Sequence, residues 1–418
     1  MTNDGAQQQP IELSSSEQAE FNRQLEVLEF GTLEITPRNE FDLMLKKSIK
    51  EGIPLRVKCG IDPTSSDVHL GHTVQYRKMR QFQDLGHIGV VIIGDYTASI
   101  GDPSGKDESR PPLSKADIEL NARTYMDQIY TVLDKERTEL FHQTEWFEET
   151  SLRDVLGWAS QTTIAKLLGH ETFRNRLDQG NSLALNELFY PVLQGIDSVY
   201  VKADVELGGS DQRFNVLMGR DYQKLENQRP QVAMLLPLLT GTCGSQKMSK
   251  SLGNYIGIYD EPFDKFGKIM SIPDDIMIEY YQYLGNLNQD EFFKVKKNIA
   301  DGQLHPNEAK KQLASHIVSF FHGQEEGQNM REKFESVFKN KNVPDDVLEF
   351  EYTRGATLVD TVVNAGIFVS KGEVRRLIKQ NAVGIVNGKK INDIAFLLDE
   401  GLSGKVVKFG KRKFVKLV

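Results

Sequence analysis

The chain of 418 residues has little cysteine, no long apolar run and no repeated or low-complexity segment. Its two cysteines, Cys59 and Cys243, provide no disulfide framework, so we expect a reducing, cytoplasmic location. No apolar run approaches the roughly 20 residues that a membrane-spanning helix requires, so we expect no membrane partner. The first residues, MTNDGAQQQPIELSSSEQ, have neither a basic start nor an apolar centre, so we expect no signal peptide.

The chain also lacks a net positive charge, since 51 Lys and Arg stand against 59 Asp and Glu, a formal net charge of −8 at pH 7. This argues against a surface that binds nucleic acid everywhere. The exception is residues 352–418, where 13 Lys and Arg stand against 5 Asp and Glu, a net charge of +8 that leaves −16 on the first 351 residues. A basic terminal module on an acidic body is expected when one module binds a phosphate backbone.

The stretch CGIDPTSSDVHLGH, residues 59–72, has the pattern of a nucleotide site. An apolar run at 55–61 predicts a strand, a polar turn follows it, and a long helical pattern begins next. The N-terminus of such a helix carries unpaired N–H groups and partial positive charge, which suit phosphate. His69 and His72 lie three apart on its first turn, and Gly71 leaves room for a flat ring or a phosphate.

A second basic element is the segment KMSKS at residues 247–251. Neighbouring glycines predict a loop that presents Lys247 and Lys250 with freedom to move. A single His-x-x-His pair is more often a helix surface or a satisfied core pair, and KMSKS alone can arise by chance on a basic loop. Both motifs in this order, one domain length apart, favour a shared nucleotide site.

The pattern of strand, helix and apolar strand predicts an α/β fold: a doubly wound, parallel-sheet (Rossmann-like) catalytic domain. An α-helical domain and a small α+β RNA-binding domain are expected to follow it. The expected boundaries are 1–30 for an N-terminal extension, 31–240 for the catalytic domain with an insertion at about 113–182, 241–262 for the KMSKS loop and connection, 263–340 for the helical domain, 341–351 for a charged linker and 352–418 for the last domain. The insertion reads as helical, interrupted by FHQTEWF, and the Asn387-Gly388 pair predicts a hairpin in the last domain.

The polar loop 94–110, GDYTASIGDPSGKDESR, only superficially resembles a Walker loop. Its glycines are one residue too close, and Asp107 stands where Ser or Thr is required, so we reject that interpretation. A loop after a central parallel strand still lies where ligands bind, and Asp102 could hold an ammonium group while Lys106 and Arg110 reach a departing pyrophosphate. A simple surface turn is the competing interpretation.

Two further segments suggest ligand contacts. Tyr190, Gln194 and Asp197 share one face of a predicted helix, where three polar side chains are costly to bury without partners. Intrahelical or water partners are the alternative to a polar ligand. In GGSDQ, residues 208–212, Asp211 at a helix start is either a cap or a carboxylate for ribose hydroxyls.

The motifs CGIDPTSSDVHLGH, GDPSGK, YPVLQGIDS, GGSDQ and KMSKS, in this order, resemble those of class I aminoacyl-tRNA synthetases and, within that class, of the bacterial tyrosyl-tRNA synthetases. The resemblance extends from about residue 30 to the end. It implies activation of L-tyrosine by ATP, with Mg²⁺, to tyrosyl-adenylate and pyrophosphate, then transfer of the tyrosyl group to the 3′ end of tRNA(Tyr). It also implies a homodimer formed through the insertion, anticodon recognition by the helical domain, and a ribosomal-protein-type RNA-binding domain at the end.

The resemblance assigns roles to the residues that match, without implying a metal site on the protein. The implied catalytic residues are His69, His72, Lys247, Lys250, Lys106 and Arg110. The implied tyrosine contacts are Asp102, Tyr190, Gln194, Asp197, Gln212 and Thr97. The implied ATP contacts are Cys59, Gly60, Asp62, His69, Gly71, His72, Gly209, Asp211, Lys247, Met248, Lys250 and Ser251. The expected RNA contacts are Arg375, Arg376, Lys379, Lys389 and Lys390.

The chain departs from the better-known branch of this family at two places. Lys58 stands where that branch has a tyrosine that donates to the phenol, and the residues after GGSDQ, Arg213 to Asn215, also differ. Asp197 is therefore the expected principal contact of the phenol. Three alternatives stay open at this point: tryptophan as the amino acid, a nucleotidyltransferase acting on a small molecule, and a non-catalytic RNA-binding relative.

Overall fold

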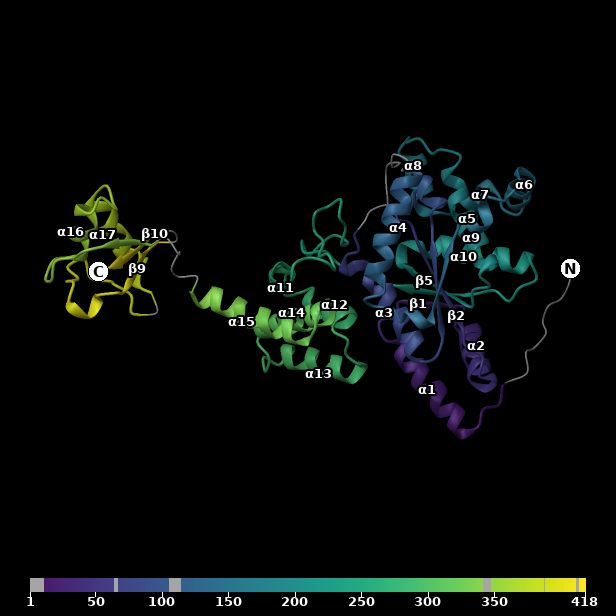
Figure 1. Ribbon diagram of the computed structural model, residues 1–418, viewed down its shortest axis with the longest axis horizontal. Helices are drawn as coiled ribbons and strands as arrows, with labels where there is room; N and C mark the ends of the chain where they lie inside the picture. Colours follow the sequence, from purple (N-terminus) through teal and green to yellow (C-terminus); the bar gives the residue numbers. More distant parts are fainter. Residues whose placement is uncertain (1–10, 64–66, 105–113, 341–346, 387, 411–412) are drawn as a thin grey trace. The chain divides into compact units, whose positions relative to one another are not determined.

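The computed structural model describes residues 11–63, 67–104, 114–340, 347–386, 388–410 and 413–418. The chain forms two compact units, Met1–Met330 and Arg331–Val418 (Figure 1). We describe each unit by itself.

The first unit is built on a six-stranded sheet with the order β1-β6-β5-β2-β3-β4. Strands β2 to β6 are parallel, and β1 pairs antiparallel with β6 at one edge. The order runs outward from β2 in one direction and from β5 in the other, so the predicted doubly wound sheet is confirmed, and its reversal point lies between these two strands. The strands are β1 Glu34–Thr36, β2 Arg56–Ile61, β3 Ile88–Ile93, β4 Thr138–His142, β5 Val205–Gly209 and β6 Val232–Leu236.

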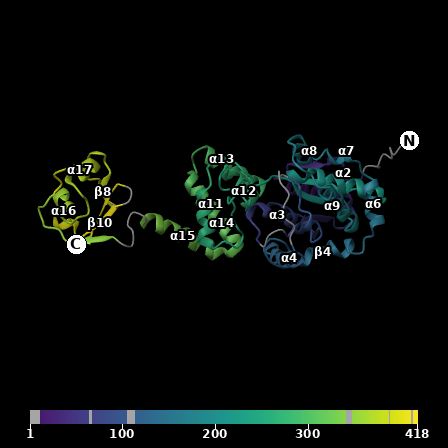
Figure 2. The ribbon, with the colours of Figure 1, turned by 90° about the horizontal axis from the view of Figure 1, so that it is seen from above.

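Helices cover both faces of this sheet (Figures 1 and 2). Val90 and Ile92 of β3 pack in one cluster with α9 and α10, whereas Gly89, on the opposite face, lies so close to Met79 of α3 that a Cβ would stand 2.9 Å from its sulfur. The longer helices of this part of the chain are α1 Ser15–Glu29, α2 Arg38–Glu51, α3 Leu70–Asp84, α4 Lys115–Ile129, α6 Leu152–Ser160, α8 Glu171–Asp178, α9 Tyr190–Tyr200 and α10 Arg213–Leu225. The short ones are η1 Thr97–Ser99, η2 Lys135–Arg137, α5 Thr144–Phe147, α7 Ile164–Leu167, η3 Glu187–Phe189 and η4 Ser210–Gln212.

The region expected to be a helical insertion contributes a strand to the sheet. Residues Thr138–His142 form β4, which pairs in parallel with β3. The helical interpretation, interrupted only by FHQTEWF, was therefore wrong for the start of this strand, and the interruption coincides with its last two residues. The strand lies at the sheet edge and its side chains are only partly buried, so its sequence shows neither a continuous apolar run nor a clean alternation. Backbone hydrogen bonds to β3, 49 residues away in the register Gly89↔Thr138, fix its conformation.

The first helix belongs to the body of the unit. The predicted capping box is present, since the Ser14 side chain accepts from the Glu17 N–H and the Glu17 side chain accepts from the Ser14 N–H. At the other end the buried Lys78 of α3 donates to three main-chain carbonyls, at distances of 3.3 Å to Val27, 3.0 Å to Leu28 and 2.8 Å to Phe30. The described part of the expected extension is therefore fixed to α3.

The region after the KMSKS loop is helical, as predicted. Its helices are α11 Pro262–Ser271, α12 Met277–Leu284, α13 Gln289–Ala300, α14 Pro306–His322 and α15 Gln324–Asn340. The Tyr280 hydroxyl of α12 donates to the main-chain oxygen of Thr240 at 2.7 Å, which joins these helices to the segment after β6. In the described part of the chain, no helix combines the length and apolarity needed to cross a bilayer.

The second unit is a small α+β domain with its own core, as predicted. Its sheet has the order β7-β10-β9-β8. Residues Leu348–Phe350 pair with β10, so part of the expected linker is a strand of this sheet. The predicted hairpin at Asn387-Gly388 is only partly described, because Asn387 lies outside the described residues; a bridge between Gly384 and Lys390 flanks it. The elements are β7 Leu348–Phe350, α16 Leu358–Asn364, α17 Lys371–Lys379, β8 Val383–Ile385, η5 Glu400–Leu402, β9 Val406–Phe409 and β10 Lys413–Leu417.

Candidate active site

A cavity of about 320 Å³ lies at the carboxyl ends of β2, β3 and β5, next to the reversal point of the sheet. This is where open α/β sheets bind their ligands. It brings together the HLGH helix start, the KMSKS loop and the polar face of α9. The lining residues that the sequence predicted are Gly60, Asp62, His69, Gly71, His72, Thr97, Asp102, Tyr190, Gln194, Asp197, Asp211, Gln212, Lys247 and Met248.

The two histidines form a stacked pair at the start of α3. Their ring centroids are 3.6 Å apart with an interplanar angle of 18°, and His72 Nδ1 accepts from the His69 main-chain N–H at 3.3 Å. Burial, with Lys250 nearby, lowers the pKa of His69 to about 4, and burial also holds the pKa of His72 well below its ordinary value. Both rings are therefore neutral at pH 7, and they can offer N–H donors but no charge.

The N–H groups at this helix start are already partnered, unlike the sequence-based expectation. The Leu70 N–H donates to the Ile256 carbonyl at 2.9 Å, and the Gly71 N–H donates to the Met248 sulfur at 3.3 Å. A thioether is a weak acceptor, so a phosphate oxygen could displace it from Gly71 but not the carbonyl from Leu70. A side chain at Gly71 would be crowded, because a Cβ would lie 3.0 Å from the His69 ring.

The lysines of the KMSKS loop are held by carboxylates. Lys247 Nζ lies 3.0 Å from Asp211 Oδ2, and Lys250 Nζ lies 3.7 Å from Asp67 Oδ2. Burial lowers the pKa of Lys250, and Asp67 acts in the opposite direction. Both ammonium groups have carboxylate partners whose negative charge a triphosphate could replace.

Asn254, which the sequence analysis did not single out, lies inside the KMSKS loop and bonds to its main chain at two points. Its Oδ1 accepts from the Ser249 N–H at 2.8 Å, and its Nδ2 donates to the Lys247 carbonyl at 3.1 Å. Asn254 is buried, and it fills the space beside Gly241, where a Cβ would stand 2.3 Å from Nδ2. It therefore fixes the main chain on both sides of Met248.

The polar face of α9 forms one wall of the cavity, as its spacing predicted. The Tyr190 hydroxyl donates to Asp62 Oδ2 at 2.9 Å, and the Thr97 hydroxyl donates to Asp62 Oδ1 at 2.7 Å. The carboxylate of Asp62 thus ties α9 to the loop after β3. Across the cavity, Gln212 Nε2 donates to Asp102 Oδ2 at 2.8 Å.

Asp197 is a buried carboxyl group of the cavity wall. Its oxygens accept from Gln143 Nε2 at 2.7 Å and from the Trp146 indole N–H at 3.2 Å. Burial raises the pKa of Asp197 to about 7, while the charge of Lys58 and the bond from Gln143 act to lower it. Gln143 and Trp146 follow β4, so a correct assignment of that strand would have placed them at this edge of the sheet.

Some expected site residues lie elsewhere. Cys59 is buried on the α3 side of β2, where its thiol donates to Gln75 Oε1 at 3.3 Å, so it does not line the cavity. Gly209, Lys250 and Ser251 lie beside the cavity without lining it, and Lys106 and Arg110 lie outside the described residues. The expected RNA contacts of the second unit are all exposed: Arg375, Arg376 and Lys379 on α17, and Lys389 and Lys390 after β8.

Lys58 and Glu206 form a buried ion pair under the cavity that the sequence analysis missed. Lys58 lies within the segment LRVKCGI and Glu206 within ADVEL, two mainly apolar segments whose other charged residues, Arg56 and Asp204, stand near the segment starts. A charge in a buried strand requires a partner, so the sequence could have marked each of these residues, although it could not have shown that they pair with each other.

A parallel sheet that reverses beside a cavity with an HLGH helix start and a KMSKS loop is the arrangement of a class I aminoacyl-tRNA synthetase. The family model described as "tRNA synthetases class I (W and Y)" matches residues 50–339, and the one described as "Tyrosine--tRNA ligase SYY-like C-terminal domain" matches residues 334–417.

Similar proteins narrow the class further. The chain is 45% identical to a tyrosine–tRNA ligase of Carboxydothermus hydrogenoformans, over 96% of this chain and 98% of that protein. It is 44% identical to a tyrosine–tRNA ligase of Moorella thermoacetica, over 95% and 96%. A truncated mitochondrial tyrosyl-tRNA synthetase of Aspergillus nidulans shares the fold with a TM-score of 0.63 at 18% identity, over 78% of this chain and 100% of that one. The chain belongs to the tyrosine–tRNA ligase family.

Proposed function

We propose that the cavity is where this tyrosine–tRNA ligase activates L-tyrosine with ATP and then transfers the tyrosyl group to the 3′ end of tRNA(Tyr). The observation that carries this proposal is the convergence of His69, Lys247 and the α9 face on one cavity, from segments up to 178 residues apart in numbering. The amino acid occupies the α9 end of the cavity, and ATP occupies the end formed by the HLGH helix start and the KMSKS loop.

In the first step the tyrosine carboxylate attacks the α-phosphate of ATP, and the bond to pyrophosphate breaks. The carboxylate is already ionised at pH 7, so no general base is needed. The protein contributes positioning and stabilisation of the phosphate charge. His69 and His72, being neutral, donate hydrogen bonds to phosphate oxygens, while Lys247 and Lys250 supply the positive charge, helped by Lys106 and Arg110, which follow η1 in the sequence.

Contacts are proposed for four groups of the substrates. Asp211 holds the ribose hydroxyls of ATP once Lys247 has moved from its carboxylate to the phosphates. Tyr190, Gln194 and Asp102 surround the ammonium group of tyrosine, with Gln212 near the carboxyl group. Asp197 accepts the phenolic O–H, which distinguishes tyrosine from phenylalanine.

Magnesium enters with ATP. Mg²⁺ keeps several of its waters and is usually bound by substrate phosphates together with one or two carboxylates. In the described ranges, no three His, Cys, Asp or Glu side chains converge into a cation site. Bound to the nucleotide, Mg²⁺ would neutralise charge on the phosphates.

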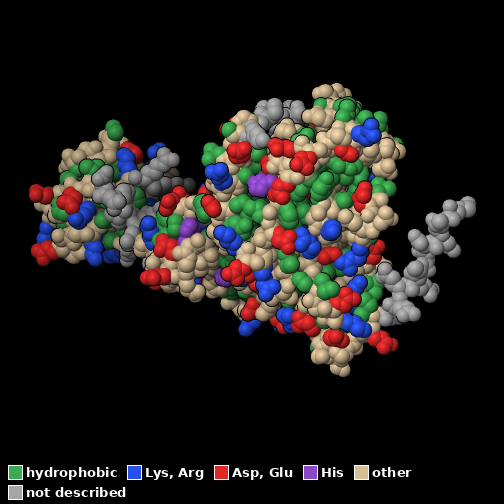
Figure 3. Space-filling view, turned by 45° about the vertical axis from the view of Figure 1, so that its right-hand side comes forward, with side chains coloured by type: hydrophobic (Ala, Val, Ile, Leu, Met, Phe, Trp, Pro, Cys, Tyr) green, Lys and Arg blue, Asp and Glu red, His purple; other side chains and the backbone are tan. Residues whose placement is uncertain are grey.

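In the second step a ribose hydroxyl at the tRNA 3′ end attacks the tyrosyl carbonyl, and AMP leaves. The second unit supplies RNA contacts through the exposed cations of α17 and of the turn after β8. On the face in Figure 3 acidic and basic side chains of the first unit are interspersed, in keeping with its net negative charge. The negative charge of the first unit repels the RNA backbone, and phosphate binding by the basic second unit offsets this repulsion.

We further propose that two copies of the chain act together in the cytoplasm. Large apolar side chains stand exposed on α6 and α7, with Leu152 73%, Leu156 61% and Ile164 68% exposed. A second copy is the partner that would cover them. Free Cys59 and Cys243 are compatible with a reducing compartment.

Pyrophosphate exchange tests the proposed reaction. The purified chain is incubated with ATP, Mg²⁺, labelled pyrophosphate and one amino acid at a time. Exchange should require tyrosine and should be orders of magnitude slower with tryptophan or phenylalanine. Preferred exchange with tryptophan would refute the amino-acid assignment, and exchange without transfer to tRNA(Tyr) would refute the second step.

A further inference from the structure

A buried ion pair supports the α9 wall of the cavity from below. Lys58 of β2 and Glu206 of β5 are register partners on adjacent strands, and their Nζ and Oε1 atoms lie 2.9 Å apart. Their side chains are 0% and 1% exposed. A buried ion pair contributes little to stability compared with apolar residues of the same volume. Stability alone therefore does not explain why these two charges are buried.

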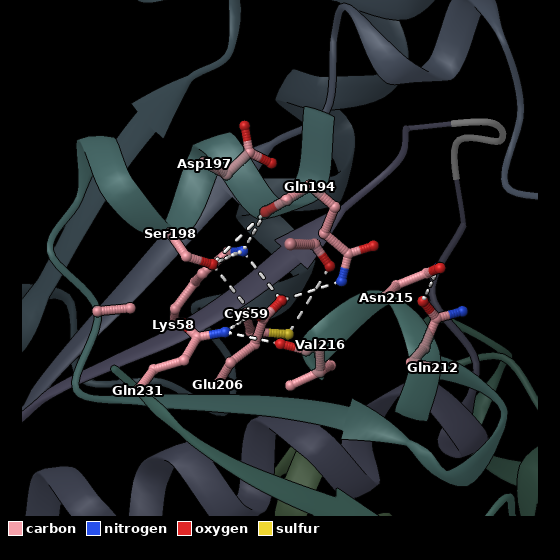
Figure 4. A network of polar contacts seen from close by, with 12 residues as sticks. Lys58, Cys59, Gln194, Asp197, Ser198, Glu206, Gln212, Asn215, Val216 and Gln231 are labelled. Carbon is pink, nitrogen blue, oxygen red and sulfur yellow. Dashed lines mark hydrogen bonds and ion pairs between the residues drawn. The ribbon is translucent and has the colours of Figure 1, made fainter. Parts of the chain in front are cut away.

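The pair is fully hydrogen-bonded (Figure 4). Besides Glu206, the Lys58 ammonium donates to Ser198 Oγ at 2.8 Å and to the Gln194 main-chain oxygen at 3.0 Å, which uses all three of its hydrogens. Glu206 Oε2 accepts from Ser198 Oγ at 3.1 Å and from Gln231 Nε2. In this network the Lys58 and Glu206 charges are paired with each other, and both side chains contact α9.

Gln194 is where this network meets the cavity. Its side-chain Nε2 donates to Glu206 Oε1 at 3.0 Å, and its main-chain oxygen is held by Lys58. An ionised carboxylate can only accept hydrogen bonds, so the nitrogen of the amide must face Glu206. The amide oxygen is then the group that Gln194 presents to a ligand in the cavity.

We propose that Lys58 and Glu206 are positioning residues of the amino-acid site, which fix the Gln194 amide with its oxygen toward the cavity and so make it an acceptor for the substrate ammonium group. An ammonium group has three donors and no acceptor. If the amide rotated by half a turn, its NH₂ group would face the ammonium, and the contact would become repulsive. The Lys58 ammonium group pairs with the Glu206 carboxylate in the interior, and Glu206 in turn accepts from the Gln194 amide nitrogen and fixes its orientation. The inference rests on the proposed placement of tyrosine in this cavity.

The test removes the ion pair without leaving a buried charge. A single substitution would strand one ion in the interior, so the variant is the double Lys58→Met, Glu206→Gln. Equilibrium binding to the full chain is measured for L-tyrosine and for 3-(4-hydroxyphenyl)propionate, which lacks the amino group. We expect tyrosine binding to weaken by roughly 10- to 100-fold, the scale of a hydrogen bond to a charged group, while the desamino compound binds as before.

Steady-state kinetics gives a second readout. The KM for tyrosine should rise, while kcat at saturating tyrosine and the KM for ATP should stay within about threefold. The control is Gln231→Met, which removes a donor from Oε2 of the same carboxylate and leaves the Oε1 bonds to Lys58 and Gln194 in place. That variant should melt at a lower temperature and retain the preference for the amino group.

The outcomes separate the two proposals. A double variant that folds and keeps the full preference for tyrosine over the desamino compound overturns the inference. If it does not fold, Gln194→Met decides, because an unchanged preference there overturns the inference as well. If the parent protein shows no tyrosine-dependent pyrophosphate exchange, the proposed function itself is refuted. The binding comparisons between variants cannot give that result, because they measure only the preference for the amino group.

Discussion

The two ends of the cavity are organised in opposite ways. At the amino-acid end every polar side chain is bonded to the protein: Tyr190 and Thr97 to Asp62, Asp197 to Gln143 and Trp146, and Gln194 to Glu206. At the phosphate end the donors are neutral histidines, and the cations Lys247 and Lys250 stand on a loop with carboxylates as partners.

This difference follows from the groups that each end has to recognise. A ring hydroxyl and an ammonium group are small, and discrimination requires acceptors fixed in advance by a second layer of hydrogen bonds. A triphosphate carries enough charge to displace a carboxylate from a lysine, and it leaves as pyrophosphate and AMP. A loop that exchanges one anion for another suits that end, because it can stabilise charge and then release the product.

The largest effect is expected at the phosphate end. Lys250→Ala should slow adenylate formation on the order of 100-fold or more, about 3 kcal/mol of transition-state stabilisation, with tyrosine affinity unchanged. A single-turnover measurement at saturating tyrosine and ATP gives the rate. Lys224→Ala, an exposed lysine at the end of α10, is the matched control and should behave as the parent. An unchanged single-turnover rate in Lys250→Ala would remove this lysine from the mechanism.

The next effect is on specificity at the amino-acid end. Tyrosine-specific synthetases are the known case of rejecting phenylalanine without editing, on the order of 10⁵-fold, which sets the scale for this test. Asp197→Asn should lower the ratio of kcat/KM for tyrosine over phenylalanine by roughly 10- to 100-fold, because the phenol loses an ionised acceptor. Asp221→Asn, at a half-buried carboxylate of α10 that pairs with Lys166, serves as control. Undiminished rejection of phenylalanine would show that another group recognises the hydroxyl.

A smaller effect on adenylate formation is expected for Asn254, whose side chain bonds to the main chain of the KMSKS loop. Asn254→Ala should reduce kcat for adenylate formation about tenfold and raise the KM for ATP, since Lys247 and Ser249 lose their shared anchor. The KM for tyrosine should not change. A rise in the tyrosine KM with a normal ATP KM would contradict the separation of the two ends, and Asn254→Gln, which keeps the amide, should recover part of the rate.

The smallest effect is a pH dependence of tyrosine binding. The pKa of Asp197 is raised to about 7, so the group is mostly protonated at pH 6 and mostly ionised at pH 8. An ionised carboxylate is the better acceptor for the phenolic O–H, so tyrosine should bind about threefold to tenfold more tightly at pH 8 than at pH 6. In Asp197→Asn this dependence should vanish. Equal affinities at both values in the parent would show that Asp197 does not change its charge in this range.

Much of the fold could be read from the sequence because its causes are local. The apolar runs of β2 and β3, the capping box of α1 and the spacing of Tyr190, Gln194 and Asp197 on α9 all appear in the structure as predicted. The strands that the sequence analysis did not predict include β1, β4 and β7, which are all short strands at a sheet edge. Edge strands bury few of their side chains, so their sequences show only a weak alternation of apolar and polar residues. Hydrogen bonding to the neighbouring strand decides their conformation.

The sequence by itself determined which chemical groups were available: two histidines, two loop lysines, a face of α9 and a basic C-terminal module. Only the tertiary structure decided their states. The histidines are neutral because they are buried together, and Asp197 has a raised pKa for the same reason. Lys58 meets Glu206 from 148 residues away. Protonation and long-range pairing depend on desolvation and on neighbours that only the folded chain supplies, and no local pattern contains them.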